Sequence, residues 1–417
     1  MSYLIKDITN LVTCKNKNGF PGKGKLQSEI GLIKKGNVFI EKGKIEFVGD
    51  YNSLKKYLKG RKNNYKVIEG KNKTVMPGFV DSHTHLVFAG SRENEYEMRI
   101  CGKSYEEIAK AGGGISATVN AVRKESKNNL FKLAEIRLKN FIKYGTTTLE
   151  AKSGYGLNFK NEIKILEVIN ELNRKNRFGV DIIPTFLGAH SIPKDMSKDD
   201  YIDMICFELI PFIAQKKLAI FQDVFCEKNY FSVKETERIL STGSKFGLIP
   251  KLHSDQFNSI GGVDVAIKLK AISIDHLEVL KSKDIKKLKN KNIIATLLPG
   301  ASYFLDVAYQ PARELISNNV PVALATDFNP GSCMTENLQI IMSLASVKLK
   351  MTAEEILNAV TINAAYALFL QNKIGSIEKG KQADLLIFDF PSYKDLLYHF
   401  AVNQIETVFK KGVIPVI

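Results

Sequence analysis

The chain has 417 residues, of which 44% are hydrophobic and 25% are charged. This balance is typical of a globular protein with a sizeable core. No apolar run approaches the roughly 18–20 residues of a membrane-spanning helix, and the first residues lack the basic and then apolar pattern of a signal peptide. The five cysteines are scattered and form no C-x-x-C pair, which favours reduced thiols and a cytoplasmic setting.

The net charge is +16, from 60 lysines and arginines against 44 acidic residues. A clustered excess of this size would indicate a nucleic-acid-binding protein. Here the excess is rich in lysine and spread along the whole chain. We therefore expect neither a nucleic-acid partner nor a membrane partner.

The first 75 residues are predicted to form short strands with turns between them, as in a small β domain. Apolar runs at 37–40 and 44–48 flank the turn Glu41-Lys42-Gly43, which is a hairpin signal. A further strand is predicted at 65–69.

From Val75 onward, strand-like runs alternate with helical segments, and this alternation favours a parallel α/β fold. Helical periodicity is found, for example, at 129–142, 161–173, 233–245 and 310–317. The pattern predicts a (β/α)₈ TIM-like barrel. The eight expected strands are 76–80, 146–150, 181–187, 220–226, 249–253, 271–275, 293–297 and 321–325.

The end of the chain is again predicted to contain short strands, like its beginning. Residues 353–370 are predicted as one helix, and strands follow at 385–389 and 405–410. We expect this tail to join the N-terminal strands. Residues 1–75 and 371–417 would then form a composite β-sandwich domain beside a barrel of residues 76–370.

One short stretch joins these two parts. It runs from Val75 to His85 and reads VMPGFVDSHTH. Side chains two residues apart on a strand point to the same face, so His83 and His85 would converge at the strand's end and could supply two metal ligands. Taken alone, the pattern equally fits two incidental histidines.

The other histidines strengthen the interpretation as a metal site. Of six in the chain, five fall at or just beyond the C-terminal end of an expected strand, and Asp327 follows the last expected strand in the same way. That end of a barrel is where catalytic groups lie. Packing alone does not explain five such placements, which are His83, His85, His190, His253 and His276.

The order of these motifs resembles the amidohydrolase superfamily and, in detail, its imidazolonepropionase family. The resemblance covers nearly the whole chain. The segments that carry it are PGFVDSHTH (77–85), AGSRENEYEMR (89–99), AGGGI (111–115), KSGYGL (152–157), GAH (188–190), HSDQ (253–256), DHLE (275–278), TDFNPGS (326–332) and GSIEKGKQADLLIFD (375–389).

The resemblance assigns four ligands to one divalent metal, zinc or iron, and three imidazoles with a carboxylate suit either ion. The ligands are His83, His85, His253 and Asp327. Relatives with two metals use a carboxylated lysine or an equivalent carboxylate on the fourth barrel strand. That strand has no lysine here, and Asp223 and Glu227 are left as possible ligands. We favour a single metal, with both acids paired to basic neighbours.

The resemblance further implies hydrolysis of a cyclic amide. A metal lowers the pKa of bound water to about 7, so that hydroxide is available to attack the ring carbonyl. His276 is expected to stabilise the oxyanion and to act as base and then as acid. Gln256 stands where related hydrolases often carry a glutamate. Because an amide cannot exchange protons at neutral pH, Gln256 would hydrogen-bond the substrate ring while His276 and Asp327 move the proton.

The implied substrate is 4-imidazolone-5-propanoate, opened to N-formimidoyl-L-glutamate in histidine degradation. The guanidinium group of Arg92 suits the carboxylate of this substrate. The segment Gly112–Gly114 is expected to be a mobile lid, His399 a structural or surface residue, and the protein a homodimer. The other expected substrate contacts are Tyr105, Tyr155, His190, Gln256, Asn329, Gly331 and Ser332.

Two alternatives remain at this stage. The first is another mononuclear amidohydrolase, such as an aromatic-base deaminase or a hydantoin-type hydrolase, although a deaminase would normally need the acid that Gln256 replaces. The second is a basic, catalytically silent binding protein, for example one for RNA. Such a protein would bind no metal, and it would bind nucleic acid in a salt-sensitive way.

Overall fold

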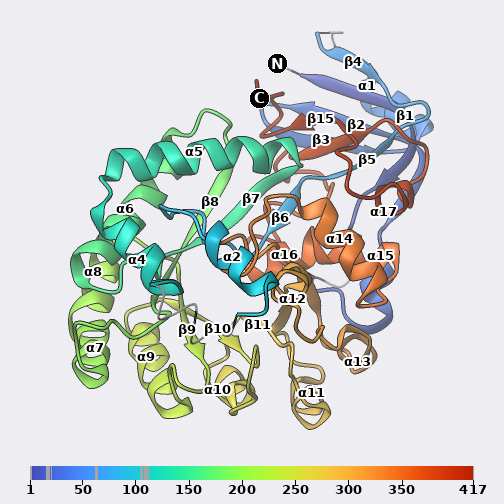
Figure 1. Cartoon of the computed structure of the whole chain (residues 1–417). Helices are drawn as coiled ribbons and strands as arrows, with labels where there is room; N and C mark the ends of the chain where they lie inside the picture. The colour runs from blue at the N-terminus through green and yellow to red at the C-terminus, as the bar shows by residue number, and fades with distance from the viewer. Residues whose placement is uncertain are drawn as a thin grey trace.

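The structure is a computed structural model that describes residues 2–15, 19, 21–61, 64–103, 107 and 112–416. The described strands form two sheets, one of eight parallel strands and one of seven mixed strands. Figure 1 shows the eight-stranded sheet surrounded by helices, with the mixed sheet beside it at the upper right. Both chain termini lie on the side of the mixed sheet.

The eight-stranded sheet is the predicted barrel, and its strands follow one another in chain order. These strands are buried almost throughout, because helices cover the outside of a parallel barrel and side chains fill its interior. The barrel strands are β6 (Phe79–Asp81), β7 (Thr146–Lys152), β8 (Asp181–Ala189), β9 (Phe221–Cys226), β10 (Ile249–Ser254), β11 (Ser273–His276), β12 (Ile294–Leu297) and β13 (Val322–Leu324).

Several of the helices that pack around the barrel begin at clear capping signals. Ser232 with Glu235, and Thr352 with Glu355, form capping boxes at the starts of α9 and α15, which satisfy otherwise unpaired N–H groups. The helices along the barrel part of the chain are α2 (Glu93–Ile100), α4 (Ile115–Lys124), α5 (Lys127–Lys143), α6 (Phe159–Lys175), α7 (Lys198–Met204), α8 (Ile210–Lys216), α9 (Val233–Lys245), α10 (Gly262–Lys268), α11 (Ser282–Leu288), α12 (Pro299–Leu305), α13 (Ala312–Ser317), α14 (Leu338–Val347), α15 (Ala353–Ala359) and α16 (Ile362–Ala367), with a π-helical turn at Ile205–Leu209.

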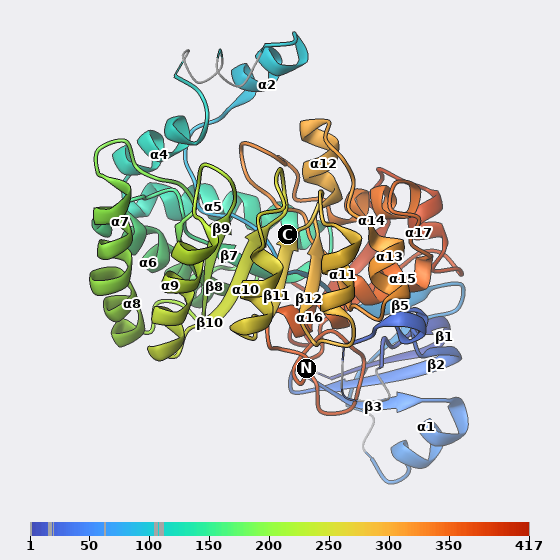
Figure 2. The same cartoon turned by 90° about the horizontal axis from the view of Figure 1, so that it is seen from below.

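The first and last barrel strands meet at the C-terminal mouth, just beyond their ends. Thr84 and Phe328 form an isolated parallel bridge. The N–H of Asp327 donates to the C=O of His83 at 3.0 Å, and the N–H of His85 donates to the C=O of Phe328 at 2.9 Å. Figure 2 shows the strands running toward the side that carries α2 and α12. The seam therefore lies at the mouth, between segments that carry predicted ligands.

The second sheet combines strands from both ends of the chain, as predicted. Its order is β15-β14-β5-β1-β2-β3, and β4 pairs with β1. The strand β1 changes register between Ile5 and Ile8, and its two halves pair with β4 and β5 in turn. The sheet bends around a small core of its own that includes Ile5, Val38 and Leu385. Its strands are β1 (Tyr3–Val12), β2 (Leu32–Glu41), β3 (Lys44–Gly49), β4 (Lys66–Glu69), β5 (Thr74–Pro77), β14 (Leu385–Phe388) and β15 (Ile405–Phe409), accompanied by α1 (Tyr51–Leu58), α17 (Asp395–Tyr398) and a 3₁₀ turn at Gly24–Ser28.

A partly buried ion cluster joins the two sheets at the base of the barrel. The Nζ of Lys410, after β15, lies 2.9 Å from Asp181 at the start of β8 and 2.8 Å from Asp384, before β14. Gln382 and Lys411 complete the hydrogen bonds of both carboxylates. We name these five residues the basal cluster.

Three local predictions need correction. The expected strand 76–80 is divided at Gly78, since β5 belongs to the mixed sheet and β6 to the barrel. The single helix predicted at 353–370 is two helices, α15 and α16, because the C=O of Val360 accepts the N–H of Val80 in β6. The helix α1, capped by Asp50, was not predicted among the N-terminal strands.

Among the described residues, no helix combines the length and the apolar character needed to cross a bilayer.

Candidate active site

The four predicted metal ligands converge at the barrel mouth. His83 and His85 follow β6, His253 lies on β10, and Asp327 follows β13. One nitrogen from each of the three imidazoles lies within 4.8 Å of the others. An oxygen of Asp327 lies 3.4 Å from Nε2 of His83 and 3.7 Å from Nε2 of His85. All four side chains are buried.

Two of these imidazoles are held from behind by carboxylates. The Nδ1 of His83 lies 2.7 Å from Asp275 on β11, and the Nδ1 of His253 lies 3.0 Å from Asp223 on β9. A carboxylate at one ring nitrogen fixes the tautomer and directs the other nitrogen forward, as in metal sites. In both residues the Nε2 atom faces the centre of the cluster without a hydrogen-bond partner among the described residues.

The donor set fits a divalent metal. Burial, together with the charge of Lys152 and neighbouring imidazoles, lowers the pKa of His83 well below its usual value, and burial lowers that of His85 in the same way. These rings are therefore neutral, which is the form that binds metals. Buried imidazole nitrogens without partners are costly unless something binds them. Three neutral imidazoles and one carboxylate are the donors that suit zinc or ferrous iron.

His276 ends β11 in an unusual backbone conformation, with φ of 83°. A non-glycine residue in this region is strained, and such strain gathers at functional sites. Its Nδ1 lies 3.3 Å from Glu278, which also accepts a hydrogen bond from Gln310. Burial acts to lower the pKa of His276, but the charge of Glu278 and its hydrogen bond outweigh burial and raise that pKa to about 9.

A cavity of about 170 Å³ opens beside this cluster. The ring of His190 stacks on His85 with centroids 5.0 Å apart, and Tyr155 packs against both rings. Burial lowers the pKa of His190 to about 3 and raises that of Tyr155, so both side chains are neutral. The described residues that line the cavity include the predicted Arg92, Tyr155, His190, Gln256, His276, Asp327, Asn329, Gly331 and Ser332, together with Ile115, Phe225, Tyr230, Phe257 and Leu305.

Arg92 is the residue before α2, and its side chain lines the cavity. Glu95 binds one edge of its guanidinium group, at 2.8 Å from Nε and 2.7 Å from Nη2. On the other side, a Cβ atom built on Gly331 would lie 2.1 Å from Nη1 of Arg92. Only glycine therefore allows this close approach. The arginine is fixed in position with donors remaining for an anion, since a guanidinium group carries five N–H donors.

The turn after Asp327 is organised by Asn329. The Oδ1 of Asn329 accepts the backbone N–H groups of Gly331 and Ser332, both at 2.8 Å. The hydroxyl of Ser332 donates to Oδ2 of Asp327 at 2.9 Å. This turn therefore orients the carboxylate of Asp327 as well as bordering the cavity.

Comparison with known proteins places the chain among the amidohydrolases and, more closely, beside curated imidazolonepropionases. The amidohydrolase family model matches residues 255–414. The imidazolonepropionase of Shouchella clausii is 45% identical over 414 residues, covering 99% of this chain and 92% of that protein. The imidazolonepropionase of Alkaliphilus metalliredigens is 44% identical over 412 residues, covering 98% and 96%.

The chain belongs to the imidazolonepropionase family.

Solved structures share the fold of this imidazolonepropionase family member at low identity. A zinc-bound adenosine deaminase from Xanthomonas campestris has a TM-score of 0.72 at 16% identity, with 99% of this chain and 92% of that chain covered. The guanine deaminase of E. coli has a TM-score of 0.72 at 15% identity, with 99% of each chain covered. These likenesses concern the fold alone.

Several predicted residues do not lie at the metal cluster of this imidazolonepropionase family member. Asp223 pairs with Lys152 at 2.7 Å behind His253, as expected of a paired strand acid. Glu227 instead accepts hydrogen bonds from the backbone N–H groups of Phe257 and Asn258. The prediction that Glu227 pairs with a basic residue is therefore wrong. Tyr105 lies outside the described residues, and His399 is exposed on the surface.

Other residues near the site were missed by the sequence analysis. Glu150, Lys152 and Lys251 are fully buried in the barrel interior, below the histidines. One signal was available, since Glu150 and Lys152 stand two apart on an expected strand and so share a face. Charged residues facing the inside of a barrel need partners.

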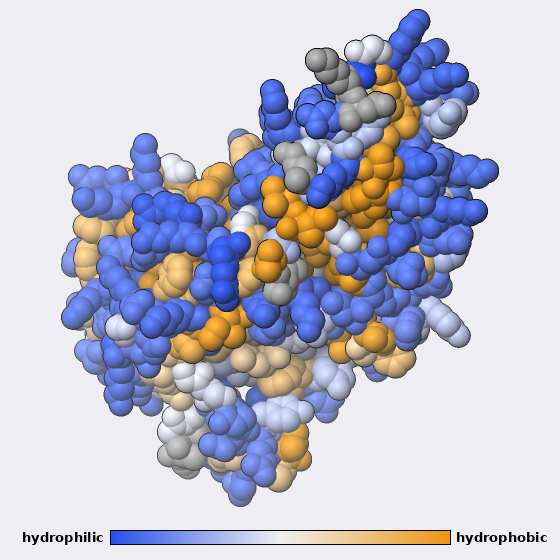
Figure 3. Space-filling view, turned by 90° about the horizontal axis from the view of Figure 1, so that it is seen from above, coloured by the Kyte–Doolittle hydropathy of each residue, from blue (hydrophilic) through white to orange (hydrophobic). Residues whose placement is uncertain are grey.

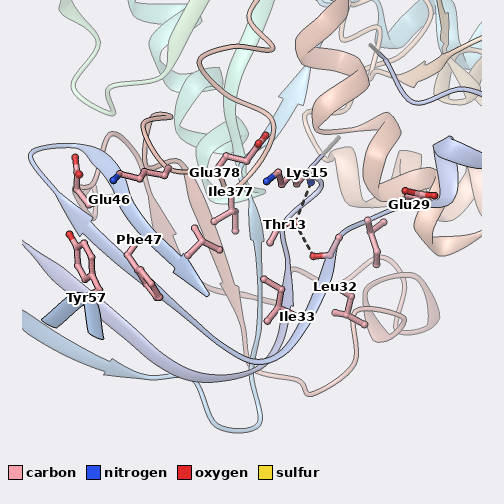
Figure 4. A pocket seen from close by; sticks show the side chains of 14 residues that line it. Thr13, Lys15, Glu29, Leu32, Ile33, Glu46, Phe47, Tyr57, Ile377 and Glu378 are labelled. Carbon is pink, nitrogen blue, oxygen red and sulfur yellow. Dashed lines mark hydrogen bonds between the residues drawn. The ribbon is translucent and has the colours of Figure 1, made fainter. Parts of the chain in front are cut away.

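A larger cavity of about 870 Å³ lies in the mixed-sheet part of the chain (Figure 4). Its lining is largely apolar and includes Ile33, Phe47 and Ile377. The Thr13 hydroxyl, drawn in Figure 4, donates to the C=O of Gly31 and accepts the N–H of Lys15. No histidine lines this cavity, so the smaller one at the barrel mouth is the candidate active site of this imidazolonepropionase family member.

Proposed function

We propose that the protein hydrolyses the cyclic amide bond of 4-imidazolone-5-propanoate to give N-formimidoyl-L-glutamate, a step in L-histidine degradation. Family membership over nearly the whole chain supports the reaction class, a hydrolase acting on carbon–nitrogen bonds. The observation that carries the substrate is Arg92, a fixed cation in the same cavity as the histidine cluster.

The metal site proposed here consists of His83, His85, His253 and Asp327, which would hold one zinc or iron ion. When bound there, a divalent ion would polarise the ring carbonyl and lower the pKa of water to about 7. Inductively coupled plasma analysis of protein purified with and without added metal would distinguish zinc from iron and give the stoichiometry.

The side chains of the cavity would orient the substrate. Arg92 would pair with the propionate carboxylate through two N–H groups, which suits its planar fork. The rings of Tyr155 and His190 would border the imidazolone ring, and the amide of Gln256 would hydrogen-bond it. Asn329, Gly331 and Ser332 would contact polar groups of substrate or product. Phe225 and Leu305 line the cavity and would exclude water from the bound ring.

Proton transfer is proposed for His276 and Asp327. Glu278 lies at Nδ1 of His276, which leaves Nε2 of that ring for the substrate. As an imidazolium, His276 would stabilise the oxyanion and then protonate the departing ring nitrogen. Burial raises the pKa of Asp327 above its usual value, which favours its acting as a proton acceptor in this proposal. Gln256 takes no part in proton transfer.

The direct experiment is an assay of metal-loaded protein with imidazolonepropionate, with formation of N-formimidoylglutamate followed by mass spectrometry. Turnover is the expected result. Hydrolysis or deamination of an uncharged ring, such as a hydantoin or an aromatic base, with no turnover of imidazolonepropionate, would instead favour another mononuclear amidohydrolase.

We also propose a homodimer in a reducing, cytoplasmic setting, with domain limits at residues 75/76 and 370/371. All five cysteines are free. Figure 3 shows apolar side chains gathered on the face of the molecule where the C-terminus lies. Exposed apolar residues near the C-terminus include Val413, Ile414 and Val416, and such exposed patches are typical of interfaces. Sedimentation equilibrium would give the oligomeric state.

A further inference from the structure

Lys152 lies inside the barrel directly behind the candidate metal ligands. Its Nζ lies 2.7 Å from Oδ2 of Asp223 and 3.5 Å from Oδ2 of Asp275. These are the same two oxygens that face the imidazoles, at 3.0 Å from Nδ1 of His253 and 2.7 Å from Nδ1 of His83. One ammonium group thus touches both carboxylates that hold the metal-binding rings.

The position of Lys152 is itself fixed at both ends. Its backbone N–H donates to the C=O of Thr84, the residue between His83 and His85, at 2.9 Å. Its ammonium group also lies 3.0 Å from Glu150, whose other oxygen lies 2.7 Å from Lys251. Glu150 in addition accepts the hydroxyl of Thr185. The lysine cannot turn away without breaking several buried contacts.

The charges of this cluster suit a lysine held for a metal centre. Lys152 and Lys251 contact three buried carboxylates, namely Glu150, Asp223 and Asp275. A fourth buried carboxylate, Asp327, lies beside His83 and His85, so the carboxylates of the group outnumber its ammonium groups by two. A divalent cation would bring it to neutrality, as expected where buried charges must be compensated.

We propose that Lys152 is a positioning residue of the metal centre, whose ammonium group holds Asp223 and Asp275 in the orientation that directs His253 and His83 toward the ion. The inference rests on the proposed metal site. Loss of a group outside the ligand shell typically lowers metal affinity by about 10- to 100-fold. Lys152 acts on two ligands at once, so we expect an effect in this range.

The test compares cobalt binding by metal-free wild-type protein with binding by Lys152→Met, using a chromophoric chelator as competitor. We expect the variant to bind Co²⁺ about 10- to 100-fold more weakly and to show altered d–d absorption bands, which report ligand geometry. Lys152→Gln keeps N–H donors but loses the charge and the full length of the lysine, so its cobalt affinity should fall between those of the wild type and Lys152→Met. It also serves as the test if the methionine variant does not fold.

Lys410→Met is the matched control. Lys410 is likewise a buried lysine between two aspartates, but it lies in the basal cluster. It should lower the melting temperature and leave cobalt affinity and spectrum unchanged. A purely structural role for Lys152 predicts the same behaviour in its own variants, and that result would overturn the proposal.

Failure of the underlying metal site gives a different result. In that case the wild-type protein would itself bind no cobalt and show no d–d bands. If the wild type binds one ion and a folded Lys152 variant binds it with equal affinity and an identical spectrum, only the assignment of Lys152 fails.

Discussion

Two clusters in this molecule each hold a buried lysine between two aspartates, but they differ in how completely their polar atoms are paired. In the basal cluster, Lys410 lies between Asp181 and Asp384, and every carboxylate oxygen has a donor. At the barrel mouth, Lys152 lies between Asp223 and Asp275 in the same way. The imidazoles in front of it nevertheless have ring nitrogens without partners among the described residues.

The difference separates a structural role from a functional one. A buried ion cluster whose hydrogen bonds are complete has nothing left to bind, and it joins two parts of the chain. A cluster that keeps neutral nitrogen atoms unpaired carries a free-energy cost that folding alone does not recover. Burial of a lysine alone therefore does not indicate a functional site. The unpaired polar atoms around the lysine are what indicate one.

The largest expected effect comes from removing a ligand at the mouth. His253→Ala should lower kcat/KM by at least about four orders of magnitude, since enzymes commonly accelerate reactions by about 10⁶-fold or more. The metal-free variant should stay folded, because the basal cluster is intact. Activity assays and circular dichroism measure the two effects. Substantial activity in this variant would contradict the proposed ligand set.

A substitution in the basal cluster should affect the stability of the protein and not its catalytic activity. Lys410→Met leaves two buried carboxylates without their main partner and should lower the free energy of unfolding by about 3–5 kcal/mol. Urea denaturation measures the change. Activity per folded molecule should match the wild type, and a loss of activity without a loss of stability would show that the two clusters are not separate.

The basal cluster also predicts how stability depends on pH. Burial acts to raise the pKa of Asp181, but the ammonium groups of Lys410 and Lys411 outweigh burial and hold that pKa below its usual value. Its contribution to stability is therefore present above the unfolded pKa of about 3.9 and is lost as the pH falls through the folded pKa. Acid unfolding curves should show this dependence in the wild type and a weaker one in Lys410→Met.

A smaller effect is expected at the substrate end of the mouth. Arg92→Ala should lower kcat/KM roughly 30- to 150-fold, which corresponds to about 2–3 kcal/mol of transition-state stabilisation lost with the charged hydrogen bonds. The loss should arise mainly from a higher KM. Steady-state kinetics with imidazolonepropionate measures it. Arg313→Ala is a matched control, because Arg313 pairs with the buried Glu355 as Arg92 pairs with Glu95, but it does not line the cavity. Equal losses in both variants would argue against a role in substrate binding.

The smallest expected effect is a titration. In metal-free protein, the ring of His276 should titrate with a pKa of about 9, above its ordinary value of about 6.5. A bound divalent cation should lower that pKa by repulsion, and Glu278→Gln should lower it in the absence of metal. Proton NMR of the ring signals measures both. A pKa that does not respond to Glu278→Gln would exclude this carboxylate as the cause.

The barrel could be predicted from the alternation of strands and helices, and the meeting of the histidines at its mouth from their places at strand ends, whereas the choice of the four proposed ligands came from the family resemblance. A strand end places His83 and His85 on one face, and five histidines at strand ends can meet only if the strands are parallel. The two helices within 353–370 could not be predicted, since the carbonyl of Val360 is engaged by Val80 from a distant strand. The partners of Lys152 come from β9 and β11. No residue spacing along the chain indicates that these side chains contact one another.

The seam at the barrel mouth bears on the order of events during synthesis. His83 lies near the start of the barrel sequence and Asp327 near its end, yet their backbones are hydrogen-bonded to each other. The growing chain therefore cannot present a complete ligand set until the last strand has left the ribosome and paired with the first. Loading of the proposed metal would then be a late event that fastens the two ends of the barrel together, and an ion that arrived early would find at most three of the four proposed ligands.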